Sequence, residues 1–532
     1  MGDKISARSR MIESGVPVIP GDEVAIPDDS DHLGTLASVA ARVGYPLLLK
    51  ASAGGGGKGM RIVREPKMLR TEYEAAAREA SAAFVDGTVY VERLLTGARH
   101  IEIQILADKY GNCIHLNERD CSLQRRHQKV IEEAPSSAVS DELRKSMGES
   151  AVLAAKSVDY VGAGTVELLL SSNGDFYFLE MNTRLQVEHP VTEMITGVDL
   201  VQKQLEIASG LPLGISQDSV SISGHSIEAR IYAEDPKNDF LPSPGLIQAL
   251  NLPKEGRFDF GVRSGDYVST FYDPMLGKVI VHGENREKAR AKLVECLKDM
   301  YVQGIETNKN FLCYVLNSEL FKKDIIQITD LDDLALQFKK LLPDEIDIIG
   351  AALIILSTES KLKNKMWRLW GSGSTKMLLK QSEKSYEVKI SSSDGQKFQC
   401  NVEDKIFNVD RVLLTKKTIS FDVNQRLVNL EFRVKEKIIS LFRKGGTFTF
   451  ENVTNLHKSN EADVQESIIV APITGSIAKI MVKNGQIVSK EDPVMFIEAM
   501  KMEYQLVALK SGKVSGCLLY TSPSPRDATL SR

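Results

Sequence analysis

Apolar and polar residues alternate over positions 1–330 in a way that predicts short strands interspersed with helices. Period-two alternation or a short apolar run predicts strands at 44–50, 89–95, 100–108, 165–170 and 176–182. Helices are predicted for 68–84, which is rich in alanine, and for 141–158, which is amphipathic. The last two strands flank an SSNGD turn and are expected to pair. The pattern favours an α+β fold with a mostly antiparallel sheet.

The second part of the chain has a different pattern. A leucine-rich, acidic stretch at 330–345 predicts a helix that begins a new unit. Short strands separated by turn residues fill 365–455 and predict a small β-barrel or sandwich. The polar segment 455–467 shows no periodicity and is interpreted as a linker, and a last β-rich unit follows it. Several domains are expected, because 532 residues exceed what one hydrophobic core supports.

Composition excludes several classes of protein. The 67 Lys and Arg residues nearly balance 71 Asp and Glu, which gives a net charge of −4 and argues against nucleic-acid binding. No apolar run is long enough to span a membrane. The six cysteines lie far apart and none forms a C-x-x-C pair, so we expect no zinc site or disulfide framework.

A glycine-rich loop follows the first predicted strand. Four consecutive glycines (Gly54, Gly55, Gly56 and Gly57) lie between Lys50 and Lys58. Such a run lets backbone N–H groups close around a polyanion, and the two lysines add charge suited to phosphates. The loop is not a Walker A motif, and a flexible hairpin tip is the alternative.

Acidic and amide side chains recur on the strands around 164–189. Glu167, Glu180 and Asn182 offer the hard oxygen ligands that Mg²⁺ or Mn²⁺ prefers, and the last two are expected on one face. Arg184, Gln186 and Glu188 are interpreted as continuing the same alternation. A solvated polar face is the alternative.

Two further motifs carry candidate chemistry. The segment 118–135 holds Arg119, Arg125, Arg126, His127 and Lys129 among acids, which suits a small anion beside ATP, although a surface salt-bridge run fits equally well. The segment EAMKM places Lys501 between two methionines directly after a predicted strand. An exposed hairpin lysine is the alternative for the second motif.

These four motifs together resemble the biotin-containing α subunits of acyl-CoA carboxylases. The resemblance covers nearly all of 1–516. It implies an ATP-grasp biotin carboxylase without its N-terminal subdomain, followed by a β-rich subunit-interaction domain and a partial biotinyl β-barrel. The implied boundaries are 1–213 for the ATP-grasp domain, 214–330 for the carboxylase C-terminal domain, 331–454 for the β-rich domain, 455–466 for the linker and 467–516 for the biotin carrier.

The resemblance also implies a role for each candidate residue. ATP would be bound by the glycine loop and by Lys4, Lys50, Glu92, Leu95, His100 and Gln124. Metal ions, Mg²⁺ or Mn²⁺, would be held by Glu167 and Glu180 with Asn182 beside them. Bicarbonate would contact Lys129, Arg184, Gln186 and Val187. Glu188 would be the general base, Arg230 would stabilise the biotin enolate, and Lys501 would carry biotin.

The implied reaction is ATP-dependent carboxylation of biotin by bicarbonate through carboxyphosphate. The partners would be a carboxyltransferase β subunit, which binds the acyl-CoA, and a biotin protein ligase. The β-rich middle with WRLW most resembles 3-methylcrotonyl-CoA carboxylase, whereas the glycine loop looks as much like propionyl-CoA carboxylase. The location would be cytoplasmic in a bacterium and the mitochondrial matrix in a eukaryote.

Two other classes of function compete with this interpretation. Another ATP-grasp ligase is the first, and EAMKM argues against it. The second is a fragment that acts only as a carrier or assembly module. The family continues on the N-terminal side of Met1, and residues 517–532 resemble a read-through adapter rather than the family, a disordered tail being the alternative. We therefore expect that the chain as written is poorly biotinylated.

Overall fold

The computed structural model of the chain describes most of its length. The described residues are 4–21, 32–52, 60–84, 87–126, 128–338, 342–359, 373–381, 384–392, 397–435, 437–443, 446–454, 469, 471, 476–499 and 502–515. The glycine loop, His127, the WRLW segment, the linker, Lys501 and residues 517–532 lie outside these ranges. We refer below to an N-terminal unit (4–338), a barrel unit (342–454) and a C-terminal unit (476–515).

A small three-stranded sheet lies near the start of the N-terminal unit. Its order is β2-β1-β3, and both pairs are antiparallel. The strands are β1 (Leu47–Ala51), β2 (Arg61–Val63) and β3 (Val89–Arg93), and the helices nearby are α1 (Lys4–Glu13), α2 (His32–Val43), η1 (Pro66–Met68) and α3 (Leu69–Phe84). Leu47, Leu49 and Val91 pack with Tyr73 of α3 in one core. The predicted strands and the helix at 68–84 are confirmed.

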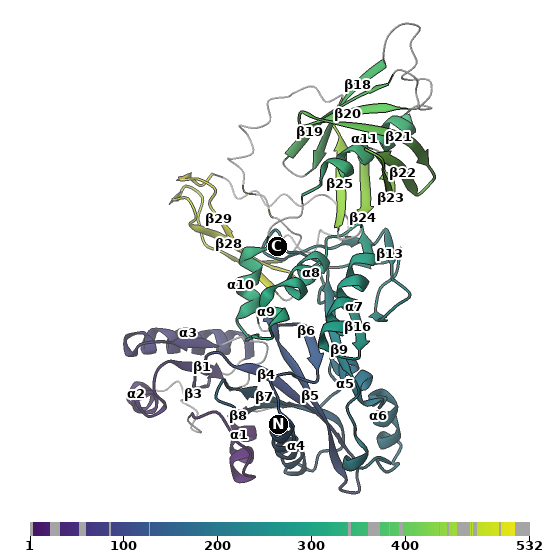
Figure 1. The fold of residues 1–532 in the computed structure, drawn as a ribbon. Helices are drawn as coiled ribbons and strands as arrows, with labels where there is room; N and C mark the ends of the chain where they lie inside the picture. The colour runs from purple at the N-terminus through teal and green to yellow at the C-terminus, as the bar shows by residue number, and fades with distance from the viewer. Residues whose placement is uncertain are drawn as a thin grey trace.

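An eight-stranded antiparallel sheet forms the centre of the N-terminal unit (Figure 1). Its order is β14-β16-β9-β6-β5-β4-β7-β8, so β6 and β9 join two stretches that lie far apart in the chain. The strands are β4 (Arg99–Ala107), β5 (Cys113–Arg125), β6 (Gln128–Ala134), β7 (Gly162–Leu170), β8 (Phe176–Asn182), β9 (His225–Tyr232), β14 (Arg257–Phe260) and β16 (Met275–Gly283).

Helices cover this sheet, and short strand pairs flank it. The helices are α4 (Asp141–Lys156), α5 (His189–Thr196), α6 (Leu200–Ala208), η2 (Gln217–Ser219), α7 (Arg286–Asp299), α8 (Lys309–Asn317), α9 (Glu319–Lys322) and α10 (Asp330–Gln337). The short strands are β10 (Glu234–Asp235), β11 (Leu241–Pro242), β12 (Gly245–Leu246), β13 (Ala249–Asn251), β15 (Tyr267–Val268) and β17 (Tyr301–Gln303).

The helix α10 (Asp330–Gln337) belongs to the N-terminal unit, whereas its sequence suggested that it begins the next unit. Leu331 and Leu334 of α10 are buried in the core that α7, α8 and β16 form. The expected helix exists, but it completes the N-terminal unit and does not begin the next one. Its apolar residues find their partners on preceding elements, which the local pattern does not reveal.

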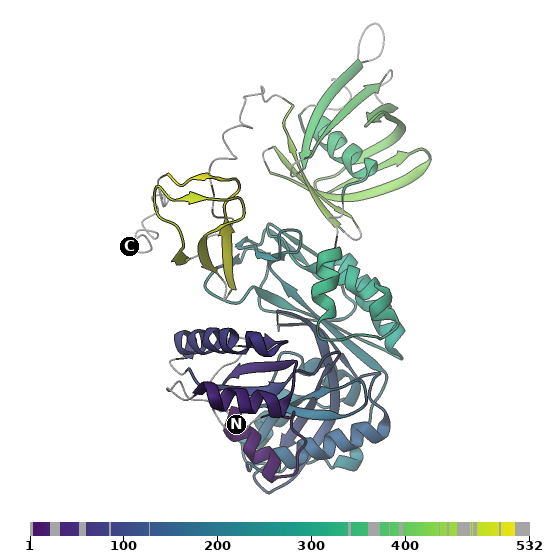
Figure 2. The ribbon, with the colours of Figure 1, turned by 90° about the vertical axis from the view of Figure 1, so that its left-hand side faces the viewer.

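The barrel unit is a closed eight-stranded barrel, in the order β18 to β25. Its strands are β18 (Gly373–Gln381), β19 (Lys384–Ser392), β20 (Phe398–Val402), β21 (Lys405–Leu414), β22 (Thr418–Val423), β23 (Arg426–Lys435), β24 (Ile438–Arg443) and β25 (Gly446–Asn452). The apolar helix α11 (Glu345–Glu359) contacts strands from all round the barrel and shares their core, as Figure 2 shows. Of the predicted alternatives, barrel or sandwich, the structure has the barrel, while α11, β18 and β20 were not predicted.

The C-terminal unit contains two small antiparallel sheets. One has the order β26-β28-β29 and the other pairs β27 with β30. The strands are β26 (Ser476–Ile480), β27 (Ile487–Val488), β28 (Pro493–Ala499), β29 (Met502–Val507) and β30 (Gly512–Lys513). Among the described residues, no helix is long and apolar enough to cross a lipid bilayer.

Candidate active site

A row of charged side chains crosses the central sheet from β4 to β8. Glu102 on β4 lies opposite Glu167 on β7, and Glu167 lies opposite Glu180 on β8. Directly opposed residues of an antiparallel pair point to the same face, so the three carboxylates share one side of the sheet. His100 precedes Glu102 by two positions and joins the same face.

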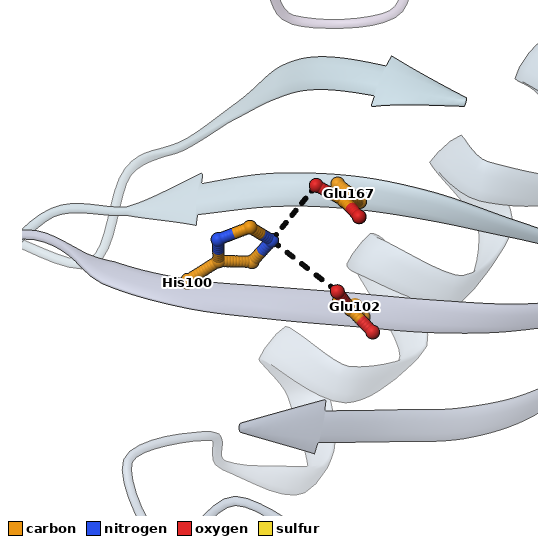
Figure 3. A group of neighbouring side chains, drawn as sticks. All are labelled: His100, Glu102 and Glu167. Atoms are coloured by element: carbon orange, nitrogen blue, oxygen red, sulfur yellow. Dashed lines mark ion pairs between the residues drawn. The ribbon is translucent and has the colours of Figure 1, made fainter. Parts of the chain in front are cut away.

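An ion cluster forms where these strands meet (Figure 3). The Nε2 atom of His100 lies 3.0 Å from Oε2 of Glu167 and 3.4 Å from Oε1 of Glu102. Burial lowers the pKa of His100, but the two carboxylates outweigh burial and raise that pKa to about 9. In this arrangement the imidazole is protonated near neutral pH and forms ion pairs with both carboxylates.

Lys129 on β6 connects three carboxylates. Its ammonium donates to Oε1 of Glu167 at 3.0 Å, to Oε1 of Glu188 at 2.8 Å and also to Glu102. Burial opposes the charge of Lys129, but the three carboxylates raise its pKa well above the usual range. Burial raises the pKa of Glu102, while Lys129 and other cations bring it down to about 2. All four groups are consequently charged near neutral pH.

Glu188 lies between two cations. It occupies the N-cap position of α5, where Pro190 stands in the first turn. Its Oε2 atom accepts a hydrogen bond of 2.9 Å from Nη2 of Arg230 on β9, opposite the bond from Lys129. Burial and Glu102 raise the pKa of Glu188, but Lys129, Arg230 and Arg119 lower it overall. The carboxylate is therefore ionised and able to accept a proton.

Arg230 is itself held by a second carboxylate. Its Nε atom donates to Oε1 of Glu132 on β6 at 2.6 Å. Glu132 and Glu228 are opposed on β6 and β9, and both are fully buried. Burial raises the pKa of Glu132 to about 7 although Arg230 lowers it. The guanidinium thus has a fixed orientation and keeps its charge at any working pH.

Arg119 on β5 organises the floor of this site. It is fully buried and donates hydrogen bonds of 2.7–3.3 Å to five side chains: Glu102, Gln104, Thr165, Gln186 and Thr192. The bond to Gln186 fixes that side chain, whose amide in turn donates to Glu167 at 2.8 Å. A planar fork with five donors suits such a position better than an ammonium group.

The strand that carries Glu180 ends earlier than its sequence suggested. β8 stops at Asn182, and Arg184, Gln186 and Glu188 lie in the turn that leads into α5. The predicted continuation of the alternation is wrong, because the chain leaves β8 after Asn182 and turns into α5, which begins at His189 with Pro190 in its first turn. The turn still brings Gln186 and Glu188 to the site, and Arg184 donates to Asn182 at 3.3 Å.

The remaining predicted residues lie on several elements, with Lys50 and Glu92 in the three-stranded sheet. Lys50 donates to Glu92 at 2.5 Å, and Arg8 lies 3.5 Å from the same carboxylate. Gln124 lies 2.8 Å from Nδ1 of His100. The carbonyl of Val187 accepts a hydrogen bond from Lys278 on β16. Leu95 lies just after β3. Lys4 is the first residue of α1, and the side chain of Lys4 lies outside the described part of the chain.

The donor set fits a divalent cation at the β7–β8 hairpin. Glu167 and Glu180 are opposed carboxylates, and Asn182 lies next to them, its amide donating to Glu167 at 2.8 Å. Burial raises the pKa of Glu167, but His100 and Lys129 lower it far below the usual range, so the carboxylate stays ionised. Carboxylate oxygens of this kind are the ligands that Mg²⁺ and Mn²⁺ prefer.

Sequence reasoning missed three residues of this site. Glu102 was detectable from the sequence, because it lies two positions after His100 on a strand whose opposite face is mostly apolar. Glu132 and Lys278 gave no such signal, because they reach the site through the pairing of β6, β9 and β16.

Family models match three stretches of the chain. Residues 3–216 match the ATP-binding domain of the carbamoyl-phosphate synthase L chain, residues 228–333 the biotin carboxylase C-terminal domain, and residues 466–519 a domain described as biotin-requiring enzyme. The α subunit of mitochondrial methylcrotonoyl-CoA carboxylase from Dictyostelium discoideum is 40% identical over 97% of this chain and 77% of that protein. This chain belongs to the biotin-dependent acyl-CoA carboxylase α subunits.

Other relatives agree with this family. The propionyl-CoA carboxylase α chain of Caenorhabditis elegans is 37% identical to this acyl-CoA carboxylase α subunit, over 96% of this chain and 75% of that one. The biotin carboxylase domain of the Hydrogenobacter thermophilus 2-oxoglutarate carboxylase, solved with MgADP, ADP and bicarbonate, is 42% identical with a TM-score of 0.62. That match covers 64% of this chain and 75% of the solved one.

The family resemblance inferred from the four motifs is thereby confirmed. This acyl-CoA carboxylase α subunit is an ATP-dependent biotin carboxylase, a ligase that requires biotin. The predicted attachment residue Lys501 lies outside the described residues, between Ala499 and Met502, which are paired across β28 and β29.

Proposed function

We propose that this chain is the α subunit of a 3-methylcrotonoyl-CoA carboxylase, working with a carboxyltransferase β subunit that binds the acyl-CoA. The named relatives support this choice: α subunits of methylcrotonoyl-CoA carboxylase from Dictyostelium, rat and mouse are 37–40% identical to it. Propionyl-CoA carboxylase is the second candidate, on the strength of the Caenorhabditis relative. The compartment follows the source, the mitochondrial matrix in a eukaryote and the cytoplasm in a bacterium.

The observation that carries the catalytic proposal is Glu188 held between Lys129 and Arg230. Bicarbonate binds against Lys129, Arg184, Gln186 and the backbone of Val187, and its proton passes to Glu188. An oxygen of the resulting dianion then attacks the γ-phosphorus of ATP, the bond to ADP breaks, and carboxyphosphate forms. Lys129 and Arg119 offset the negative charge that develops between the two anions.

The remaining roles follow from the same arrangement. Mg²⁺ that accompanies ATP is held by Glu167 and Glu180, while Lys50, His100, Gln124, Lys4 and the glycine loop bind the nucleotide with Glu92 and Leu95. Biotin, attached to Lys501 by a biotin protein ligase, supplies the nitrogen that accepts the carboxyl group. Arg230 stabilises the negative charge on the biotin ring, since its guanidinium is fixed by Glu132 and always charged.

Bicarbonate-dependent ATPase activity of the full-length protein tests the catalytic proposal. Glu188→Gln keeps the shape of the side chain and removes the base, so the activity should fall by roughly 10²–10⁴. Glu206→Gln on α6, where the half-exposed carboxylate pairs with Lys203, is the matched control and should leave the rate unchanged. An undiminished rate in Glu188→Gln would contradict the assignment.

The acyl specificity needs the partner subunit. The α chain is co-purified with its β subunit, and incorporation of labelled bicarbonate is compared for methylcrotonoyl-CoA, propionyl-CoA and acetyl-CoA. We expect the highest kcat/KM for methylcrotonoyl-CoA. A higher value for propionyl-CoA would assign the chain to the second candidate.

A further inference from the structure

Glu228 is a fully buried acidic residue in the middle of β9. Neither oxygen of its carboxyl group has a hydrogen-bond partner among the described residues. Its ion-pair partner in that part of the chain is Lys278 of β16, whose Nζ atom lies 3.7 Å from Oε2 of Glu228, too far for a hydrogen bond. Burying a carboxylate anion without a donor is costly, so we expect this side chain to hold a proton.

A second carboxyl group lies directly opposite Glu228 in the sheet. Glu132 on β6 is its register partner, so both side chains point to the same face, with Cβ atoms about 4.5–5.5 Å apart. Glu132 is also fully buried, and its Oε2 atom has no hydrogen-bond partner in the described part of the chain. Like charges this close and this buried disfavour each other, so the pair holds one proton and one negative charge.

Each carboxyl group of this pair has its own cation. Arg230 donates through Nε to Oε1 of Glu132 at 2.6 Å, whereas Nζ of Lys278 lies 3.7 Å from Oε2 of Glu228. Arg230 and Lys278 are themselves opposed on β9 and β16, and Lys278 is held by its bond to the carbonyl of Val187. The negative charge of the pair therefore has two possible positions, on Glu132 beside Arg230 or on Glu228 beside Lys278.

The proton of the pair rests on Glu228 in the structure without substrates. Burial and the anions Glu132 and Glu188 raise the pKa of Glu228 well above its usual range, against the effect of Lys278 and Arg230. Burial raises the pKa of Glu132 only to about 7, because Arg230 lowers it. Glu132 is therefore the ionised member, and it will bind a proton readily once Arg230 acquires another anion.

We propose that Glu228 is a positioning residue for the biotin step, which passes its proton to Glu132 when negative charge develops on the biotin ring beside Arg230. The O–H bond of Glu228 breaks and an O–H bond of Glu132 forms, so the pair keeps one proton and one negative charge throughout. The counter-charge then lies beside Lys278, and the charge of Arg230 is left for the biotin ring. The transfer reverses when the ring loses its charge. This role rests on the proposed function, in which Arg230 faces biotin.

Infrared spectroscopy of the full chain without substrates tests where the proton lies. A protonated carboxyl group and a carboxylate absorb in separate regions, so the spectrum of each variant shows which form it has lost. Glu228→Gln should lose a protonated carboxyl band of the wild type. Glu118→Gln, at a fully buried carboxylate that Arg144 holds at 2.8 Å, is the matched control and should lose a carboxylate band. Loss of a carboxylate band in Glu228→Gln would show that Glu228 is ionised and would overturn the proposal.

Activity measurements on the same variants test the role of the proton in the reaction. Free-biotin carboxylation and bicarbonate-dependent ATP hydrolysis are measured in the full chain, and their ratio is compared. Glu228→Gln keeps the shape and the neutral resting state but cannot release a proton, so the ratio should fall roughly tenfold, less than the roughly 10²–10³ expected when an anion loses its partner altogether. The fall should appear in kcat and not in the KM for biotin, because only the charged state is affected. Glu118→Gln should keep the wild-type ratio.

A conservative variant separates this role from a purely structural one. Glu228→Asp keeps an acid proton, so it should shift the protonated carboxyl band rather than remove it and should keep more of the ratio than Glu228→Gln, also where the glutamine variant does not fold. A wild-type ratio in Glu228→Gln, or equal losses of both activities in the two variants, would overturn the proposal. A wild-type protein without bicarbonate-dependent ATP hydrolysis would contradict the proposed function itself, while the infrared result would still decide where the proton lies.

Discussion

Replacement of Arg230 by methionine should change the base of the reaction as well as the biotin step. Arg230 bonds Glu188 at 2.9 Å and Glu132 at 2.6 Å, so the variant leaves two buried carboxylates without their shared cation. Methionine keeps much of the volume of the side chain and carries no charge. Loss of Arg230 should therefore raise the pKa of Glu188.

The size of the effect follows from the geometry. At an effective dielectric constant of about 20, unit charges 2.9 Å apart attract by about 6 kcal/mol, which sets an upper limit. The net effect is smaller, since Lys129 still holds Glu188 and Glu132 will bind a proton when its cation is gone. We expect the pKa of Glu188 to rise, because an adjacent opposite charge that lowers it is lost.

The assay is the pH dependence of bicarbonate-dependent ATPase activity, measured together with free-biotin carboxylation. A raised pKa moves the acid limb of the ATPase profile to higher pH, so the variant should lose activity relative to wild type as pH falls and approach wild type at higher pH. Biotin carboxylation should remain lower by roughly 10²–10³ at every pH, because the charge on the biotin ring has lost its partner. Adding Glu132→Gln should leave the acid limb where Arg230→Met puts it, because Glu132 without its cation is already protonated there.

Arg286→Met is the matched control, since Arg286 is also a partly buried guanidinium paired with a β6 carboxylate, Glu133, away from the site. It should lower stability and leave the acid limb in place. An acid limb that does not move in Arg230→Met would refute the inference that Arg230 sets the ionisation of Glu188.

Three further changes have defined outcomes. Burial raises the pKa of Glu133, but His225 and Arg286 lower it to about 2. The stabilising effect of Glu133 is therefore full above its ordinary pKa of 4.5 and is lost as pH falls toward 2. In denaturant titrations, Glu133→Gln should lower the free energy of unfolding at pH 7 by roughly 3 kcal/mol and flatten the acid dependence of that free energy. Leu353→Ala in α11 should destabilise the barrel unit by roughly 2–5 kcal/mol, whereas Leu336→Ala at an exposed position should not, as thermal unfolding will show. Glu180→Gln should raise the Mg²⁺ concentration needed for half-maximal ATPase, and an unchanged requirement would remove Glu180 from the metal site.

The sequence alone determined the features that depend on neighbouring positions. Period-two alternation located β4, β7 and β8, and the hairpin between the last two brings Glu167, Glu180 and Asn182 together because only a short turn separates them. The glycine loop and the EAMKM segment identified the family for the same reason, since each is a local pattern tied to one chemistry.

The tertiary structure decided the features that depend on distant pairing. Lys129 and Arg230 meet at Glu188 only because β6 pairs with β9 across about a hundred residues of chain, which no local pattern encodes. The packing of two helices also depends on distant residues. α10 packs on the preceding N-terminal unit and α11 shares the core of the barrel, and neither partner can be read from the local pattern.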